Sequence, residues 1–385
     1  MNAPRESGFV GRRPPMDGDT QGTVVVGGGQ AGLAVGYHLR QRGLPFVILD
    51  AHPRIGDSWR TRWDSLRVFT PARYDGLPGM RFPAPRGSYP GKDQVADFLE
   101  RYAERFDLPV RTDTRVDAVR RDGDGYRVTS GSDAWSADSV VIATSAYHTP
   151  SVPSFASDLD EGIVQLHSKE YRRPGQLQAG DTLVVGAGNS GAEIAMELSR
   201  SHRIRLSGRD TGQEPVSASG TLKDRIITPL IWFAANHVLR PSNPLGRKAR
   251  DHFLDPPRGI PLARVRRRDL LDAGVERVPR TVAVEGGKPV LEDGRVLDVR
   301  NVVWCTGFRP DFRWVELPIF GDYGLPKHER GLVPTHPGLY FVGLPFQSAL
   351  ASSLIGGVGR DARYVAERIG ERAVRRRPRA VPAKP

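Results

Sequence analysis

Two glycine-rich turns have the spacing that brings backbone N–H groups against a diphosphate. They are Gly27-Gly28-Gly29-Gln30-Ala31-Gly32 and Gly186-Ala187-Gly188-Asn189-Ser190-Gly191. In such a turn the first glycine permits a tight bend, the second allows the pyrophosphate to approach, and the third lets a helix pack close to a strand. The N-terminus of that helix attracts the phosphate charge. The sequence therefore predicts two dinucleotide sites.

The residue after each second strand predicts which nucleotide is bound. Asp50 follows Gly32 at the spacing of an acid that accepts hydrogen bonds from a ribose diol, which FAD and NAD both carry. The second motif has Ser207-Gly208-Arg209 at this place and no acid. Because a carboxylate would repel a 2′-phosphate, whereas Ser207 and Arg209 would bind one, NADPH is favoured over NADH. Asp210 leaves open that Arg209 is only a surface residue.

The elements around both motifs fit this interpretation. Apolar runs at 23–26 and 182–185 predict buried strands. Each is followed by a helix with one apolar face and then by a second strand, at 45–49 or 204–206. We predict an α/β protein with two Rossmann-like dinucleotide-binding domains.

Several further motifs, taken in order along residues 21–371, resemble those of the flavin-containing monooxygenase family. Ile55-Gly56-Asp57-Ser58-Trp59-Arg60 is similar to a segment along the FAD, to which Trp59 and Arg60 would contribute. The segment Ile355-Gly356-Gly357-Val358-Gly359-Arg360-Asp361 is similar to the opening of the last helix, whose N-terminus points at the flavin. In this segment Gly357, Arg360 and Asp361 are the candidate FAD contacts.

The resemblance implies that the NADPH domain is inserted into the FAD domain. On this basis residues 21–150 and 301–371 form a discontinuous FAD domain. Residues 151–300 form the NADPH domain, with a helical insert near 217–268 that approaches the flavin. Residues 1–20 and the basic 372–385 are expected to be disordered tails.

The family implies an enzyme that uses NADPH and O₂ to oxygenate a small organic substrate at N, S or a carbonyl, through a C4a-(hydro)peroxyflavin. The candidate catalytic residues are Thr70, in place of a flavin-facing Asn, and the His167 and Tyr171 of a linker fingerprint. A structural role for His167 and Tyr171 remains an alternative. Trp232, Phe233 and His237 are candidates for substrate contact or for packing. The alternative function is an NAD(P)H-dependent flavin oxidoreductase or electron-transfer enzyme without oxygen insertion.

Composition limits the other classes. Cys305 is the single cysteine, which excludes a dithiol or a cysteine-based metal site and favours a reducing cytoplasm. The net charge of +12 lies partly in the C-terminal run, without the interleaved aromatic residues that bind nucleic acid. A nucleic-acid-binding flavin sensor is therefore a minor alternative. We expect no signal peptide, spanning helix or metal ion, and a homodimer is one possible assembly.

Overall fold

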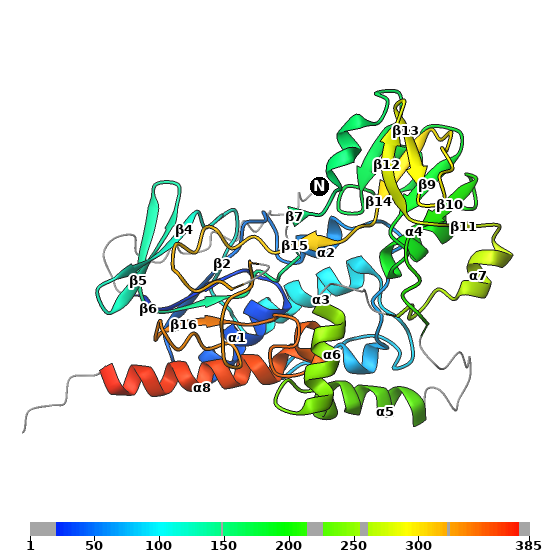
Figure 1. The fold of residues 1–385 in the computed structure, drawn as a ribbon. Helices are drawn as coiled ribbons and strands as arrows, with labels where there is room; N and C mark the ends of the chain where they lie inside the picture. The colour runs from blue at the N-terminus through cyan, green and yellow to red at the C-terminus, as the bar shows by residue number, and fades with distance from the viewer. Residues whose placement is uncertain (1–20, 148, 214–225, 255–260, 322–323, 377–385) are drawn as a thin grey trace, which may run out of the picture.

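The computed structural model describes residues 21–147, 149–213, 226–254, 261–321 and 324–376. Two separate parallel-stranded sheets organise this part of the chain (Figure 1). The predicted N-terminal tail, residues 377–385 and segments 214–225 and 255–260 of the insert lie outside the described residues.

The first sheet has the strand order β3-β2-β1-β6-β5-β4, with β16 also paired to β6. Strands β1 (Gln21–Val26), β2 (Phe46–Leu49), β3 (Val110–Arg111) and β16 (Leu339–Phe341) run parallel to their neighbours. Strands β4 (Ala118–Asp122), β5 (Gly125–Ser130) and β6 (Asp133–Ile142) form an antiparallel extension. A late strand thus completes an early sheet, as a discontinuous domain requires.

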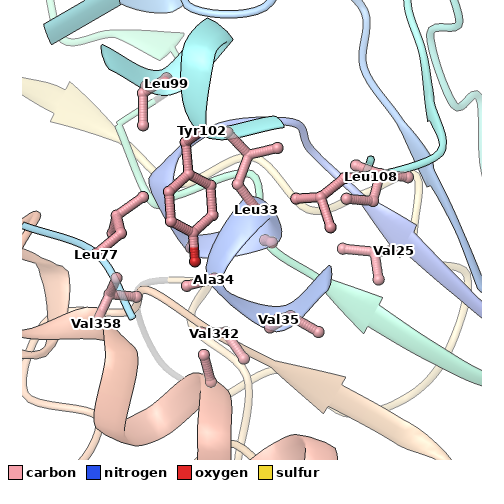
Figure 2. Close-up of a cluster of buried hydrophobic side chains, with 14 of the residues drawn as sticks. Val25, Leu33, Ala34, Val35, Leu77, Leu99, Tyr102, Leu108, Val342 and Val358 are labelled. Atoms are coloured by element: carbon pink, nitrogen blue, oxygen red, sulfur yellow. The ribbon is translucent and has the colours of Figure 1, made fainter. Parts of the chain in front are cut away.

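Three helices pack on one face of this sheet. They are α1 (Gln30–Gln41), α3 (Lys92–Arg105) and α8 (Val358–Arg376). Figure 2 shows Leu33 of α1, Tyr102 of α3 and Val358 of α8 converging in this core, and all three are fully buried. Burial of such side chains contributes about 1.5–3 kcal/mol each. The core therefore fixes the N-terminus of α1 relative to that of α8.

The second sheet has the order β11-β10-β9-β14-β8, and all its strands are parallel. Its strands are β8 (Val164–His167), β9 (Thr182–Val185), β10 (Ile204–Ser207), β11 (Glu276–Val278) and β14 (Asn301–Trp304). Helix α4 (Asn189–Leu198) buries Ile194 and Leu198 against one face, with α7 (Arg267–Asp272) beside it. The hairpin β12 (Thr281–Glu285) and β13 (Lys288–Leu291) contributes to a second apolar cluster.

The predicted domain boundary at residue 301 is wrong. Asn301–Trp304 is β14, which pairs with β8 and β9 inside the second sheet. The crossing between the sheets follows it: β15 (Phe308–Arg309) pairs with β7 (Thr149–Pro150), so both connections run side by side. The remaining boundaries stay a proposal.

The segment of the insert at residues 226–254 lies against the first sheet's helices rather than the second sheet (Figure 1). It comprises α5 (Thr228–Phe233), the π-helical turn η5 (Ala234–Val238) and α6 (Pro244–Leu254). Leu239 O accepts a hydrogen bond from the N–H of Leu350, in the short helix η7 (Leu350–Ser353) that precedes α8. Position along the chain therefore does not determine which sheet the insert contacts.

The predicted start of a disordered tail at residue 372 is also wrong. Helix α8 continues to Arg376, and its last turns are tied to the β4–β5–β6 extension. Arg372 and Arg376 donate to the carbonyl oxygen of Asp124 at 2.8 and 2.6 Å, and Arg376 pairs with Asp138 at 3.3 Å. Two of the basic charges of the C-terminal run are therefore structural.

Candidate dinucleotide sites

The two glycine turns have the same geometry. Gly27 and Gly186 adopt φ values of +107° and +109°, which favour glycine. A Cβ at Gly27 would lie 2.8 Å from Ala143 O, and one at Gly186 would lie 2.2 Å from Cys305 O. The third glycines allow close packing as predicted, since a Cβ on Gly32 or Gly191 would lie 1.9 or 1.8 Å from the first glycine's carbonyl oxygen.

The second glycine of each turn faces open space. A Cβ on Gly29 or Gly188 would meet no atom within 4 Å. Both residues are helix N-caps, and no side chain caps either helix. The N–H groups of the first turn of α1 and of α4 are therefore left for a ligand, as a diphosphate site requires. These residues fit the two expected dinucleotides.

The Asp50 carboxylate lies directly beside the first turn. It accepts hydrogen bonds from Gly28 N at 2.5 Å, from His52 N at 2.8 Å and from the His52 ring at 2.9 Å. Burial opposes ionisation, but these hydrogen bonds outweigh it and lower the pKa of Asp50. The side chain is therefore an anionic acceptor held at the end of β2, and His52 is the positioning partner that the sequence motif did not reveal.

The Trp59–Arg60 segment divides into two environments. Trp59 lies beside the first turn, where its indole N–H donates to Gln30 Oε1 at 3.4 Å. Arg60 instead pairs with Asp57, Asp97 and Glu100 at 3.1, 3.0 and 3.1 Å. Its guanidinium joins α2 (Asp57–Arg60) to α3, so the structure does not support its predicted contact with FAD.

Thr70 also differs from its predicted role. Its hydroxyl donates a short hydrogen bond to Asp75 Oδ1. Asp75 is fully buried, and its Oδ2 atom has no partner within the described structure. Burial raises the pKa of Asp75 to about 7. The adjacent Tyr74 carbonyl, at the end of η1 (Ala72–Tyr74), packs so closely on Gly356 that a Cβ there would lie 1.6 Å away.

The opening of α8 uses its predicted FAD side chains for internal contacts. Arg360 donates to Asn236 O of the insert at 2.7 Å. Asp361 is fully buried and accepts a short hydrogen bond from the Ser348 hydroxyl. Gly357 packs on the Ala351 carbonyl, where a Cβ would lie 1.9 Å from the oxygen. A flavin at this helix would therefore meet backbone groups rather than these carboxylate and guanidinium groups.

His167 and Tyr171 are both buried. The His167 Nε2 atom lies 3.0 Å from Gly307 O, and its Nδ1 accepts from Lys169 N at 3.1 Å. This pattern requires the proton on Nε2. Burial lowers the pKa of His167, which favours the neutral ring. Tyr171 donates to Glu197 at 2.7 Å inside the second core. The predicted catalytic role is unsupported for both, and the structural alternative fits.

The end of β10 requires a correction of the predicted 2′-phosphate contacts. Ser207 is fully buried, and its hydroxyl is bonded to Pro279 O and Thr281 Oγ1 at 2.9 and 2.8 Å. Alternate side chains of a strand point to opposite faces of the sheet, and that of Ser207 points toward Pro279 and Thr281. Arg209 is exposed, as phosphate binding requires.

Two further arginines reach the same place from distant segments. Arg277 of β11 donates to Gly208 O at 3.0 Å, and Arg267 of α7 pairs with Asp210. Hydrogen bonding from Gly212 and the Arg267 charge lower the pKa of Asp210, against the effect of burial. Arg209, Arg267 and Arg277 thus lie around one ionised carboxylate. The glycine motif does not predict Arg267 and Arg277, because α7 and β11 lie more than 50 residues beyond Arg209 along the chain.

The other residues of the second turn are also placed by the insert. The Asn189 side chain donates to Pro261 O at 3.1 Å and accepts from Ala263 N at 2.9 Å. Ser190 lies in the first turn of α4, half-buried. Cys305 lies below Gly191, and burial raises the pKa of its thiol to about 12. This thiol is therefore protonated and not a nucleophile at neutral pH.

The described residues contain no group of three or more His, Cys, Asp or Glu side chains arranged for a metal ion. Among the described helices, none combines the length and apolar character that crossing a bilayer requires.

Comparison with known proteins extends this description. Residues 24–236 match the model of a family described as pyridine nucleotide-disulphide oxidoreductase. The chain is 39% identical to an uncharacterized CzcO-like oxidoreductase of Geobacillus kaustophilus (strain HTA426), across 89% of this chain and 96% of the relative. It is 29% identical to the probable indole-3-pyruvate monooxygenase YUCCA3 of Arabidopsis thaliana, across 91% and 87%. A solved flavin-containing monooxygenase from Stenotrophomonas maltophilia is 28% identical, with a TM-score of 0.73 over 92% and 99% of the chains.

Proposed function

We propose, from the premise that this chain belongs to the pyridine nucleotide-disulphide oxidoreductase family, that it is an FAD- and NADPH-dependent monooxygenase of small organic substrates. The observation that carries the proposal is the pair of glycine turns, in which Gly29 and Gly188 both face open space at an uncapped helix. One turn would hold the FAD diphosphate and the other that of NADPH. We further propose that the oxygen atom is transferred to a nitrogen, a sulfur or a carbonyl group of the substrate.

Bound FAD would accept a hydride from NADPH and pass the electrons to O₂. The chain's own residues bind and orient. Asp50 presents an ionised acceptor at the first turn, and Arg209, Arg267 and Arg277 supply positive charge at the second. The crossings β7 and β15 pair with each other between the two sheets, and the His167 ring hydrogen-bonds to Gly307 O just before β15.

The test is product analysis under ¹⁸O₂. Purified protein reconstituted with FAD is incubated with NADPH and a panel of amines, thioethers and ketones, and products are identified by mass spectrometry. Incorporation of one ¹⁸O atom into a substrate supports the proposal. Absence of bound flavin after reconstitution would refute it at the level of the cofactor sites.

One observation favours the second candidate, an NAD(P)H-dependent flavin oxidoreductase without oxygen insertion. The Thr70 hydroxyl donates to Asp75, so it is not available as a donor to an oxygenated flavin. For this candidate, NADPH consumption would be matched by H₂O₂ with every compound in the panel. A substrate that diverts O₂ from H₂O₂ into product would exclude it.

We also propose a location, reaction partners and an assembly for this protein. A cytoplasmic location follows from the single cysteine, and O₂ with a small organic molecule are the partners. A homodimer is an expectation that size-exclusion chromatography with light scattering would test.

A further inference from the structure

A cavity of about 730 Å³ lies beside the opening of α8. Its walls come from residues 240–242 and 250 of the insert, residues 325–330, residues 345–348 after β16, and residue 360. No residue of the two glycine turns lines it. The volume falls within the roughly 300–1,000 Å³ of small-molecule sites, so the cavity can hold an organic ligand rather than only an inorganic ion.

The charge of the lining is strongly positive. Its cationic residues are Arg240, Arg250, Lys327, Arg330 and Arg360, and Glu329 is the acid among the lining residues. Arg250 pairs with Asp251 at 3.0 Å. Within the described parts of the chain, the other four form no ion pair with a carboxylate. The buried Asp361 interacts electrostatically with Arg360 and Arg330, so it offsets part of this charge. The remaining excess of cations in a concave site attracts anions.

Arg330 occupies a backbone conformation that seldom holds an arginine. Arg330 and Gly331 have φ values of +51° and +93° at the tip of a tight turn between Glu329 and Leu332. Such turns favour Asn, Asp or Gly. The Arg330 guanidinium stacks over the Tyr364 ring at 3.8 Å. Stacking uses the face of the guanidinium and leaves its N–H edges free for a ligand.

Arg360 supplies a second donor that the fold does not satisfy. Its Nη1 donates to Asn236 O at 2.7 Å, which fixes the side chain. Its Nη2 is buried and has no hydrogen-bond partner in the described structure. Buried donors are nearly always paired in native proteins, so this atom has the character of a ligand contact.

Apolar side chains also line the cavity, next to the polar Ser242, Gln347 and Ser348. Phe346, Pro326 and Leu325 are among the lining residues, and Phe253 stacks on Phe346 with ring centroids 5.9 Å apart. His328 adds no charge at neutral pH, since burial and the nearby Arg250 lower its pKa to about 4. A ligand here would therefore meet both apolar side chains and arginine donors.

We propose that this cavity binds an apolar organic acid, whose carboxylate is held by Arg330 and Arg360 and whose body packs against Phe346. Guanidinium groups are suited to a carboxylate because their N–H edges match its two oxygens. The site is additional to the dinucleotide sites, and it does not depend on oxygenation being the reaction.

Calorimetric titration of FAD-loaded protein without NADPH tests the site. The probes are naphthalene-2-carboxylate and its neutral analogue naphthalene-2-carboxamide. We expect the carboxylate to bind at least about tenfold more tightly than the amide, an increment of about 1.4 kcal/mol. Arg330→Gln and Arg360→Gln should each weaken binding of the carboxylate by about three- to tenfold and leave binding of the amide unchanged. Thermal midpoints confirm that the variants are folded.

Arg363→Gln is the matched control, because Arg363 lies on the same helix but is exposed and paired with Glu367 at 2.9 Å. It should bind the carboxylate as the unchanged protein does. Equal affinity for carboxylate and amide, or no binding of either at millimolar concentration, would overturn the proposal. So would undiminished carboxylate affinity in both folded variants.

Discussion

A valine side chain at position 29 would occupy the space that the first glycine turn leaves open to its ligand. Because a Cβ there meets no protein atom within 4 Å, Gly29→Val should fold normally but block approach of the diphosphate. We expect protein purified without flavin absorbance near 450 nm (about this wavelength for any oxidised flavin). Gly175→Val is the control, since Gly175 is equally open and outside both turns. A yellow Gly29→Val protein would contradict the assignment.

The arginines at the end of β10 predict a cofactor preference. Arg209→Ala and Arg277→Ala should each weaken NADPH by about 1.5–3 kcal/mol, the range for a hydrogen bond to a charged group. They should leave NADH nearly unchanged, because NADH lacks the 2′-phosphate. Steady-state KM values for both cofactors measure the difference. The exposed Arg200 provides the control variant Arg200→Ala, and equal losses with NADPH and NADH would remove either arginine from the site.

Asp75 predicts a pH-dependent stability. Burial raises its pKa to about 7, whereas the unfolded chain releases this proton near pH 4 (about 3.9 for a free side chain). The unfolded state therefore binds fewer protons between these values, and the free energy of unfolding falls as pH rises through them. Asp75→Asn removes this loss.

The stabilisation by Asp75→Asn should be absent at pH 4 and reach on the order of 2–4 kcal/mol at pH 8. Thermal midpoints of the flavin-loaded proteins at both pH values measure it. Asp107→Asn is the control, because Asp107 is exposed and Asn tolerates its positive φ. A pH-independent difference between Asp75→Asn and the unchanged protein would show that burial does not raise the pKa of Asp75.

At the scale of elements, the packing of the insert separates two neighbouring aromatic residues. Trp232 stacks on Tyr74 with ring centroids 4.9 Å apart, whereas the Phe233 side chain is 55% exposed. An aromatic pair contributes about 0.5–1.5 kcal/mol beyond its buried area. Trp232→Ala should therefore loosen α5 from η1 and speed limited proteolysis of the insert. The insert of Phe233→Ala should be cleaved at the same rate as that of the unchanged protein. Similar cleavage rates for both variants would show that the Trp232–Tyr74 stack does not hold α5 in place.

The sequence predicts the elements whose signals are local, and it misses contacts that long-range packing decides. Both βαβ starts and the resemblance to flavin monooxygenases are confirmed, because the glycine spacing and strand periodicity lie within short windows. The sequence does not predict that Ser207 is buried, because the hydroxyl that bonds to it belongs to Thr281, in the β12–β13 hairpin. Arg60 was assigned from its motif, but the α3 carboxylates that occupy it lie about 40 positions away.

At the scale of the whole molecule, electron transfer requires the two dinucleotide sites to face one another. The connection between the sheets includes the two-residue strands β7 and β15, next to which the His167 ring hydrogen-bonds to Gly307 O. Trp63, which follows α2, is also buried in the core of the second sheet. The Phe308 ring packs edge-on against the His167 ring, with ring centroids 5.1 Å apart. The Arg62 guanidinium lies over the Phe308 ring, 5.6 Å from its centroid. His167 is thus a positioning residue for the separation of the two sites.

His167→Ala should therefore slow transfer without weakening either cofactor. A misplacement of about 1 Å between reacting groups costs on the order of a hundredfold in rate, so we expect the rate of flavin reduction by NADPH to fall at least tenfold. Anaerobic stopped-flow at 450 nm (about the oxidised flavin maximum) measures that rate, and its dependence on NADPH concentration gives the affinity. His202→Ala, at the end of α4 away from the crossing, is the control. An unchanged limiting rate in His167→Ala would show that the paired strands alone fix the two sites, whereas a loss of affinity would place His167 within the NADPH site itself.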